Sequence, residues 1–575
     1  MDNLIIERDV SIPTDDGTIL KADVFRPRSG QPAPVIMTLG PYGKGVPIGV
    51  GYTAQLNWLV KKHPNVLPGS TREFLTWETV DPELWVPWGY VCIRVDSRGA
   101  GRSPGYLDMF SPREVKDLYD SIEWAGVQPW SNGKVGLNGI SYYAMNQWLV
   151  ASLQPPHLAA MVPWEGCSDF YREWGRHGGI MSNGFLEGWF PKQVLSLQHG
   201  NPNGVVDPWL KESSVGPSLL DEEQLKKNRL DSISEVLNRH LDDKFYKDRS
   251  PDWSKVTVPF LSCANWAGTG LHERGNCEGF TRAASKQKWL EIHPGRHDEW
   301  FYLQEGMDIQ KRFMDHFLMG KDNGWQDEPP VLLRLRRPFE HNHFELRKEL
   351  AWPLPSTEWS RIYFSTSDHR LSWDQPATEA SASYSSLEEP LIFTSAPLDQ
   401  DTEFTGPLAA KIFASSSTTD IDLFVTLQAF SPEGKEVEYQ GTIDPHSPLA
   451  QGWLRASHRK LDPVLSRPYR PYHTHDELQP LESGRVYELD IELWPTNIIL
   501  PAGFRLIFRV EGKDFARPDI PEDAKEFPPF VSTGSGPFLH THPEDRPKAI
   551  FGGKTTIYTG GNTASYILLP VIKPQ

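Results

Sequence analysis

The sequence predicts an α/β protein in which a doubly wound sheet carries a helical insertion and is followed by an all-β domain. Three observations favour this fold class. Short apolar runs alternate with helical patterns over residues 1–165, alternating side chains and turn residues dominate beyond Pro329 and Pro330, and the chain has 575 residues. Because a single hydrophobic core stops growing at roughly 250–300 residues, we expect two or three domains.

The expected sheet consists of continuous apolar runs bounded by proline and glycine, which are typical of strands buried on both faces. Between these runs apolar residues recur at helical spacing, and strands that alternate with helices form a parallel, doubly wound sheet. The expected strands are residues 35–39, 90–95, 135–138, 158–163, 258–262 and 288–292, and the expected helices are residues 112–124, 142–153 and 307–319.

The strand pattern stops between residues 168 and 250, where helical patterns such as residues 221–230 and 233–241 take over. An insertion at this point has the usual position of a lid or cap. The sequence therefore predicts an α/β domain of residues 1–167 and 251–325, a helical cap of residues 168–250 and a β-sandwich domain of residues 326–575.

The last part of the chain alternates apolar and polar residues with a period of two, and proline, glycine and serine separate the segments. This pattern predicts an all-β sandwich, with a jelly roll as the expected topology. The expected strands are residues 361–364, 408–414, 421–429, 487–493, 504–510 and 566–569.

Charge and hydropathy exclude two kinds of partner. The formal net charge is −17, whereas binding to nucleic acids and anionic membranes draws its affinity from clustered lysine and arginine. The chain starts without a basic segment followed by an apolar one, and it contains no run of about 18 apolar residues. We therefore expect a cytoplasmic protein with no nucleic-acid or membrane partner, and the sequence leaves a homo-oligomer open.

The sequence carries no motif for a metal or a cofactor. The four cysteines lack metal-ligand and C-x-x-C spacing, which favours reduced, buried thiols. Gly99 and Gly101 follow a strand without the rest of a dinucleotide-binding fingerprint, and there is no Walker loop. We infer that the protein uses no cofactor and no metal.

Ser141 follows an expected strand in a strand–turn–helix setting. Such a turn holds a serine in a strained conformation that only small neighbours permit, and it directs the hydroxyl to the carboxyl end of the sheet beside a helix N-terminus. Gly139 supplies one small neighbour, whereas Tyr143 stands where the G-x-S-x-G pattern has its last glycine and Ala144 follows it. We predict that Ser141 is a nucleophile.

Further motifs follow one another along the chain: ADVFRP at residues 22–27, GPYGK at 40–44, DSRGAGRS at 96–103, WSNGKVG at 130–136, GWLRASHR at 452–459 and YILLPVI at 566–572. Together with the serine turn, this ordered set resembles the cocaine-esterase and X-Pro dipeptidyl-peptidase (S15-like) family of α/β-hydrolases, whose turn reads G-x-S-Y-x-G. The resemblance covers nearly the whole chain. It implies an α/β-hydrolase fold, a C-terminal β-domain like that of X-Pro dipeptidyl-peptidases, and hydrolysis by a serine.

A serine hydroxyl needs a neutral imidazole to accept its proton. Among the 18 histidines, His297 follows the last predicted strand of the sheet, and the resemblance aligns the family's G-P-W-x-H segment there. His293 and His272 are competitors, and we expect both to be structural, hydrogen-bonded histidines. We predict that His297 is the general base.

The carboxylate that orients the base is harder to place. The resembling family has an aspartate in the loop after the preceding strand, but this chain has Gly268 there. A triad acid can instead follow the strand before that one, where Glu165 lies. We therefore predict Glu165 as the acid and keep Glu278, Glu273 and Asp298 as alternatives.

Donors must also be ready for the oxyanion that forms when the serine attacks. The resemblance implies that one donor is the hydroxyl of a tyrosine after the first sheet strand, which is Tyr42 here. The second is the backbone N–H that follows the serine, which belongs to Tyr142.

These residues predict a serine hydrolase that cleaves an ester or amide of a small acyl substrate through an acyl-enzyme. An acyltransferase would use the same residues. An X-Pro type of aminopeptidase would need carboxylates for a free amine, and Asp169, Glu173 and Glu187 are the candidates. A non-catalytic binding protein with a disabled triad is the remaining alternative, favoured by Gly268 and opposed by the intact serine and histidine.

Overall fold

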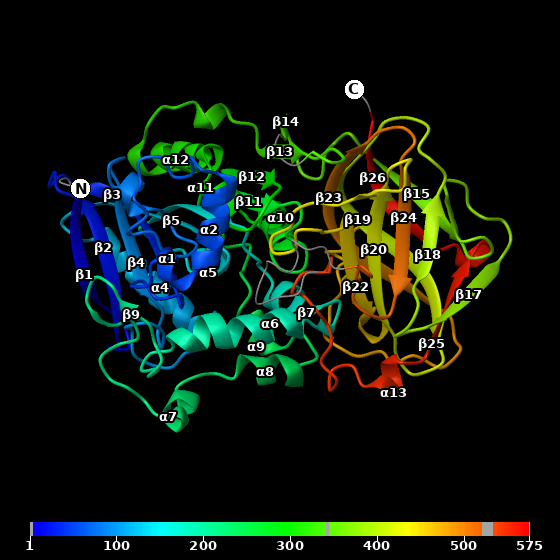
Figure 1. Cartoon of the computed structure of the whole chain (residues 1–575), viewed down its shortest axis with the longest axis horizontal. Helices are drawn as coiled ribbons and strands as arrows, with labels where there is room; N and C mark the ends of the chain where they lie inside the picture. Colours follow the sequence, from blue (N-terminus) through cyan, green and yellow to red (C-terminus); the bar gives the residue numbers. More distant parts are fainter. Residues whose placement is uncertain (1–3, 341–343, 520–532, 574–575) are drawn as a thin grey trace.

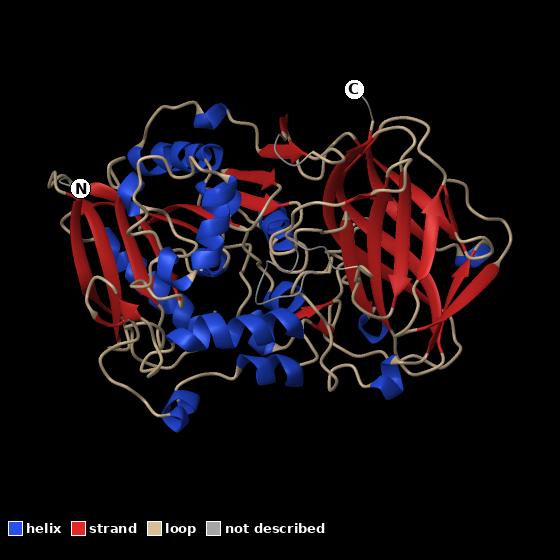
Figure 2. Ribbon diagram, in the orientation of Figure 1, coloured by secondary structure: helices blue, strands red, loops and turns tan. Residues whose placement is uncertain are grey.

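The computed structural model describes residues 4–340, 344–519 and 533–573. A ten-stranded sheet and most of the helices form the N-terminal half of the molecule, and a twelve-stranded system forms the C-terminal half (Figure 1). Figure 2 shows that helices are concentrated around the first sheet and that strands dominate the second half.

The N-terminal sheet has the order β1-β2-β4-β3-β5-β6-β11-β12-β13-β14. Neighbours from β4 to β13 pair in parallel, and the pairs β1–β2, β2–β4 and β13–β14 are antiparallel. The bounds are β1 Leu4–Pro13, β2 Ile19–Pro27, β3 Ala33–Gly40, β4 Val91–Asp96, β5 Ser131–Ile140, β6 Leu158–Trp164, β11 Phe260–Asn265, β12 Lys288–His293, β13 Val331–Leu335 and β14 Glu345–Glu349.

The predicted α/β character of this half is confirmed. All residues of β3, β4 and β11 are buried, as expected for continuous apolar runs in a parallel sheet. The sheet also extends to Glu349, past the predicted domain boundary at residue 325, because Val331 to Leu335 continue the parallel pairing of β12.

Four longer helices pack on this sheet: α4 Pro112–Gly126, α5 Tyr142–Ala151, α10 Glu273–Arg282 and α12 Gln304–Met319. The Ser111 hydroxyl caps α4 by accepting a hydrogen bond from the Glu114 N–H, and Gly320 ends α12 in the left-handed conformation. Within the described ranges, no helix has the length and apolar character needed to span a membrane. A further helix of 10 residues is α2 Thr53–Lys62, and the short helices are α1 Ile48–Gly51, α3 Pro82–Trp85 and α11 Glu299–Tyr302.

Residues 168–250 contain short helices and two small hairpins between β6 and β11. This segment docks on the C-terminal half at Gly178, whose carbonyl accepts a hydrogen bond from the Arg455 N–H at 2.8 Å. The elements are η1 Phe170–Gly175, β7 Arg176–His177, β8 Ile180–Met181, α6 Asn183–Trp189, η2 Phe190–Val194, η3 Leu195–Leu197, β9 Val206–Asp207, β10 Glu212–Ser213, α7 Glu222–Lys227, α8 Ser232–Asn238 and α9 Lys244–Lys247.

The predicted all-β character of the C-terminal half is also confirmed, and its pairings close on themselves. They run β19-β23-β22-β20-β24-β18-β16-β15-β26, and β26 pairs again with β19, which makes a barrel-like circuit. An apolar cluster fills its interior. The strands are β15 Thr357–Ser365, β16 Arg370–Ser372, β17 Ala380–Ser385, β18 Leu391–Ser395, β19 Thr402–Ser416, β20 Asp422–Phe430, β21 Glu436–Val437, β22 Ala450–Arg455, β23 Tyr487–Leu500, β24 Arg505–Glu511, β25 Lys554–Thr559 and β26 Tyr566–Ile572.

Buried polar contacts join the two halves. The Arg176 guanidinium pairs with the Asp545 carboxylate at 2.7 Å, and both side chains have no exposed surface. Arg274 pairs with Glu492 at 3.0 Å. Removing one member of such a buried pair leaves an uncompensated charge and typically costs about 3–5 kcal/mol, so these contacts fix how the halves dock.

Candidate active site

Ser141 lies on the turn between β5 and α5 with φ 57° and ψ −110°, a conformation that is costly for a residue with a side chain. Close packing explains why residue 139, two positions before Ser141, is a glycine. A Cβ atom on Gly139 would lie 2.7 Å from the Tyr143 Cβ and 3.1 Å from the Glu78 carbonyl oxygen. The side chain of Ser141 remains partly exposed, so its hydroxyl is accessible.

Tyr143 stands where the G-x-S-x-G pattern has its last glycine, and a glycine on another strand makes room for its ring. A Cβ atom on Gly40, at the end of β3, would overlap the Tyr143 ring. Gly166 likewise lets β6 approach α5, since its Cβ would lie 2.5 Å from the Ala144 Cβ. The small residues required around the turn are therefore partly supplied by neighbouring strands.

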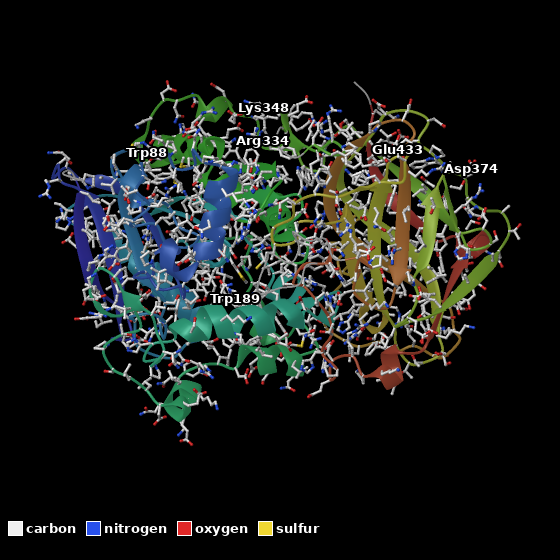
Figure 3. All side chains as sticks on the ribbon, in the orientation of Figure 1. Trp88, Trp189, Arg334, Lys348, Asp374 and Glu433 are labelled. Carbon is white, nitrogen blue, oxygen red and sulfur yellow. The ribbon has the colours of Figure 1, made fainter. Side chains whose placement is uncertain are left out.

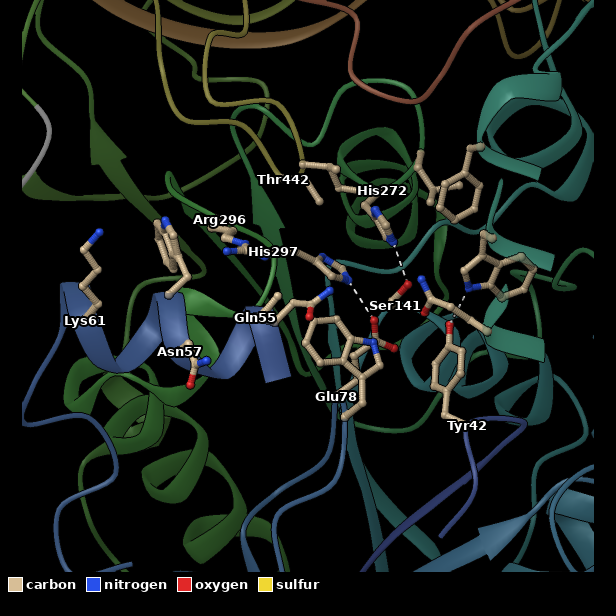
Figure 4. A pocket seen from close by; sticks show the side chains of 18 residues that line it. Tyr42, Gln55, Asn57, Lys61, Glu78, Ser141, His272, Arg296, His297 and Thr442 are labelled. Carbon is tan, nitrogen blue, oxygen red and sulfur yellow. Dashed lines mark hydrogen bonds and ion pairs between the residues drawn. The ribbon is translucent and has the colours of Figure 1, made fainter. Parts of the chain in front are cut away.

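The Ser141 hydroxyl is hydrogen-bonded to His272 Nε2 at 2.9 Å (Figure 4). His272 immediately precedes α10 and is 2% exposed. Sequence reasoning treated this histidine only as a competitor of His297. The contact that we expected between Ser141 and His297 is not formed, because His297 Nε2 is hydrogen-bonded to Glu78 Oε1 at 3.0 Å.

Glu165 contacts His297 on the other ring nitrogen, with 2.8 Å between Oε2 and Nδ1. The same carboxylate accepts hydrogen bonds from His293 Nε2 at 3.1 Å and Asn265 Nδ2 at 3.1 Å. Although burial opposes ionisation, the charges of His297 and His293 and the hydrogen bonds from both rings lower the pKa of Glu165 to about 2. Glu165 is therefore a buried carboxylate held ionised by its partners.

The alternative acids have other surroundings. Glu278 pairs with Arg470 at 2.5 Å and does not line the pocket that contains Ser141. Asp298 pairs with Arg296, with 3.7 Å between Oδ1 and Nε, and neither Glu273 nor Asp298 forms a hydrogen bond with His297 in the described part of the chain. At the position of the family's aspartate, a Cβ atom on Gly268 would lie 3.1 Å from the Asn265 carbonyl oxygen, so the loop is closely packed there.

Glu78 is a site residue that sequence reasoning missed. It lies between α2 and α3, has φ 62° and is 2% exposed. Burial raises the pKa of its carboxyl to about 7, against the stabilising contact with His297. No pattern in residues 70–81 marks this glutamate, because its contact spans 219 positions.

The two histidines have opposite electrostatic surroundings, although their ring centroids are 4.8 Å apart. Burial disfavours charge on His297, but the carboxylates of Glu165 and Glu78 outweigh it and raise the pKa of His297 to about 10. Burial and the neighbouring charge of His297 lower the pKa of His272 well below its usual value. His272 is therefore neutral where His297 is charged.

Tyr42 and Tyr142 both lie beside Ser141. The Tyr42 hydroxyl accepts a hydrogen bond from Trp189 Nε1 at 3.1 Å, which leaves its own hydrogen to donate. Burial raises the pKa of Tyr42 well above its usual value, so it stays protonated. The Tyr142 side chain turns instead to Glu114 at 2.8 Å, while its backbone N–H, at the first helical position, has no intrahelical partner.

Ser141 opens into a pocket of about 270 Å³, and a narrow apolar recess of about 20 Å³ adjoins it. The pocket is built from all parts of the chain. Trp189 of the insertion, labelled in Figure 3, lines it, and so do Thr442 and Ile443 of the C-terminal half. Aromatic and sulfur-bearing side chains line the recess: Tyr42, Phe110, Tyr142, Met145, Cys167, Trp174, Phe185 and Trp189.

One group of side chains in the described part of the chain has the composition of a metal site. Ligand atoms of Glu165, His272 and His297 lie within 4.8 Å of one another. The hydrogen bonds described above link Glu165 to His297 and His272 to Ser141. These three residues therefore also have the arrangement expected around the nucleophilic serine of a hydrolase.

A serine on a strained strand-to-helix turn, next to histidines and a buried carboxylate, defines this α/β protein as a serine hydrolase. Residues 16–299 match the family model of the X-Pro dipeptidyl-peptidases (S15 family). Residues 323–568 match the model of the X-Pro dipeptidyl-peptidase C-terminal non-catalytic domain. The chain belongs to this family of hydrolases, which act on ester or amide bonds.

Known proteins resemble the chain over its whole length. A CocE/NonD family hydrolase from Staphylococcus aureus is 32% identical, with a TM-score of 0.84 over 99% of this chain and 94% of that one. The cocaine esterase of Rhodococcus sp. (strain MB1 Bresler) is 25% identical over 99% of both chains. An aminopeptidase from a Thaumarchaeota archaeon shares the fold, with 16% identity and a TM-score of 0.69 over 99% of this chain and 97% of that one.

Proposed function

We propose that Ser141 attacks the carbonyl carbon of an ester or amide with a small acyl group and that water hydrolyses the resulting acyl-enzyme. The observation that carries this proposal is the 2.9 Å hydrogen bond between the Ser141 hydroxyl and an imidazole at the wall of a 270 Å³ pocket. A serine needs such a partner to become nucleophilic at neutral pH. The apolar recess of about 20 Å³ beside the serine favours a small acyl group.

For proton transfer we retain the predicted pair of His297 and Glu165. Their 2.8 Å hydrogen bond is the contact that a carboxylate needs in order to fix the tautomer and orientation of an imidazole. His297 lines the pocket together with Ser141, which supports a role in the reaction.

For the oxyanion we retain the Tyr42 hydroxyl and the Tyr142 N–H as donors. The tyrosine hydroxyl lines the pocket, and its contact with Trp189 fixes its direction. Donors that are already oriented before the reaction stabilise developing charge without reorganisation.

An ester is favoured over a peptide with a free amino terminus. Asp169 is paired with Arg172 at 2.9 Å and Glu173 with Arg274 at 2.7 Å, so their charge is already compensated. Neither of these carboxylates, nor Glu187, lines the pocket that contains Ser141. The name of the Rhodococcus relative also supports an ester. An acyltransferase uses the same residues and differs only in whether an alcohol or amine replaces water.

Replacement of the nucleophile tests this function. Ser141→Ala should abolish both labelling by a fluorophosphonate probe and hydrolysis of p-nitrophenyl butyrate. Ser152→Ala, at the end of α5 and away from the pocket, is the matched control and should keep both activities. Undiminished hydrolysis by a folded Ser141→Ala variant would exclude Ser141 as the nucleophile.

We also propose that the N-terminal sheet is doubly wound, that the C-terminal domain has a jelly-roll topology and that residues 168–250 form a cap. We further propose that the protein is cytoplasmic. Limited proteolysis should cut first within residues 168–250 if that segment moves as a cap over the pocket.

A further inference from the structure

Two histidines line the pocket at Ser141, and their hydrogen bonds differ in kind. His272 Nε2 contacts the Ser141 hydroxyl at 2.9 Å, and its Nδ1 has no hydrogen-bond partner within the described residues. His297 has a carboxylate on each nitrogen, Glu165 at 2.8 Å and Glu78 at 3.0 Å. A carboxylate accepts hydrogen bonds, so a ring that carries hydrogen on both nitrogens satisfies both of these contacts.

We propose that the two histidines divide the proton transfers of the reaction: His272 accepts the proton of Ser141, and His297 donates a proton to the leaving group. This inference rests on the proposed function of Ser141 and adds His272 as a further catalytic residue. It assigns to His297 the proton exchanges with the leaving group and with water, whereas a single histidine in a triad performs these together with the exchanges with the serine.

The contacts of each histidine ring support the role proposed for it. Nε2 of His297 is occupied by its contact with Glu78 at 3.0 Å, so this nitrogen is not available to the Ser141 proton while that contact is formed. His272 contacts the nucleophile directly, and neither of its charged neighbours, His297 and Glu165, forms a hydrogen bond with it.

The electrostatics agree with this division. When two titratable groups in one site have pKa values that are driven apart, the environment has separated the acid from the base. Burial and the charge of His297 keep His272 neutral, whereas Glu165 and Glu78 keep His297 protonated.

Acylation then proceeds with all atoms accounted for. The Ser141 O–H bond breaks and its proton moves to His272 Nε2, while Oγ forms a bond to the carbonyl carbon and the π electrons move to the carbonyl oxygen. The bond from carbon to the leaving oxygen or nitrogen then breaks, and that atom takes the proton of His297 Nε2. Glu78 holds this proton in position until the leaving group arrives.

Deacylation restores both rings. Water attacks the acyl carbon and gives its proton to the neutral His297 Nε2. The bond between the carbon and Ser141 Oγ breaks, and the imidazolium of His272 returns the proton to Oγ. The net reaction converts an ester and water into an acid and an alcohol.

The leaving group provides the test, because p-nitrophenolate departs without a proton whereas an alkoxide needs one. His272→Gln should lower turnover by about 10²–10⁴-fold on both p-nitrophenyl butyrate and ethyl butyrate, since each needs Ser141 to lose its proton. His297→Gln should lower turnover on ethyl butyrate by about 10²–10⁴-fold. With p-nitrophenyl butyrate the same variant should keep a fast first burst of p-nitrophenolate followed by slow turnover, because acylation needs no proton from His297 whereas deacylation of the butyryl-enzyme still needs it as the base. His316→Gln, on the outer helix α12, is the matched control and should leave both rates unchanged.

Fluorophosphonate labelling separates this inference from the proposed function. Fluoride also departs without protonation, so His272→Gln should slow labelling strongly and His297→Gln only slightly. If His272→Gln labels and turns over like the wild type while Ser141→Ala is inactive, the division is wrong and the serine hydrolase stands. If Ser141→Ala keeps its activity, the proposed function itself fails.

A measurement on the unaltered protein covers the case in which His297→Gln does not fold. Nitrogen-15 spectra of histidine-labelled wild type at pH 7 should contain a doubly protonated ring for His297 and a neutral ring for His272. The loss of one signal in His272→Gln assigns His272, and the change of one signal in Glu78→Gln, which removes a partner of the other ring, assigns His297. A neutral His297 at pH 7 would overturn the division of roles.

Discussion

The backbone N–H of His297 donates a hydrogen bond to the Thr442 carbonyl oxygen at 3.2 Å, which joins a proposed catalytic histidine to the C-terminal half of the chain. Thr442 in turn donates its N–H to the Ala267 carbonyl at 3.1 Å, and its hydroxyl lies 3.4 Å from Glu165 Oε2. The β-rich half therefore takes part in holding the site together.

We predict from this contact that a truncated chain ending at Asn323 will be insoluble or inactive. The truncation removes Thr442 and also β13, and it uncovers an apolar cluster that packs Trp266 and Ile292 against Ile572. Expression of residues 1–323, with solubility and turnover compared with the full chain, checks the prediction. A soluble fragment with full activity would show that the halves function independently.

Tyr42→Phe should lower turnover by about 10²-fold at nearly unchanged melting temperature, because it removes one oxyanion donor and keeps the ring. Tyr52→Phe is the matched control. Tyr52 is also buried and bonds Gln193 at 3.0 Å, but it does not line the pocket. If Tyr42→Phe instead lowers the melting temperature and leaves turnover unchanged, Tyr42 is structural.

Glu165→Gln should lower turnover by about 10²–10⁴-fold while substrate binding changes little, because the amide no longer holds His297 in its charged form and orientation. Steady-state kinetics with p-nitrophenyl and ethyl butyrate measures the effect. The matched variants are Glu278→Gln, Glu273→Gln and Asp298→Asn. Collapse of the rate in one of these, with Glu165→Gln still active, would transfer the role of the acid to that residue.

Gly139→Ala should destabilise the fold by about 1–3 kcal/mol and impair turnover, since the added methyl group would press on the Tyr143 Cβ and the Glu78 carbonyl. Gly49→Ala is the control, because its Cβ would meet only Leu56 at an ordinary 3.8 Å. Urea unfolding followed by tryptophan fluorescence gives both values. Equal stability of the two variants would contradict the packing argument.

The ion pair of Glu165 and His297 should make stability depend on pH at both ends of the range. The folded-state pKa of His297 is raised to about 10 from 6.5, so its contribution is complete below pH 6.5 and is lost as pH rises through 10. The pKa of Glu165 is lowered to about 2 from 4.5, so its contribution is present above pH 4.5 and is lost as pH falls towards 2. Unfolding free energies should therefore fall more steeply between pH 6.5 and 10 in the wild type than in Glu165→Gln. Parallel curves would show that the pair does not carry this dependence.

Local patterns predicted much of the fold because burial on both faces leaves a plain trace in the sequence. The runs that became β3 and β4 are continuous and apolar, and the turn at Ser141 combines a glycine with a strand and a helix. The place where the sheet ends was not predictable in this way. β13 follows two prolines that look like a domain boundary, yet it pairs with β12 through backbone hydrogen bonds that composition does not encode.

The site was predicted only where the chain order of the sheet determines it. Glu165 follows β6 and His297 follows β12, and two strands of one parallel sheet bring such residues to the same edge. The partners that sequence reasoning missed come from loops. His272 directly precedes α10 and Glu78 lies between α2 and α3, so neither residue directly follows a strand, and the order of the strands does not place them.

The close packing at Gly268 bears on how this enzyme could change by point mutation. An aspartate at that position would have its Cβ 3.1 Å from the Asn265 carbonyl and 3.3 Å from the Glu273 N–H, so the loop would have to shift before the carboxylate could turn towards His297. Asn265 also donates to Glu165, so the same shift would disturb the present partner of the histidine. A single Gly268→Asp substitution would therefore add a carboxylate and at the same time press on the loop that holds the proposed acid, Glu165.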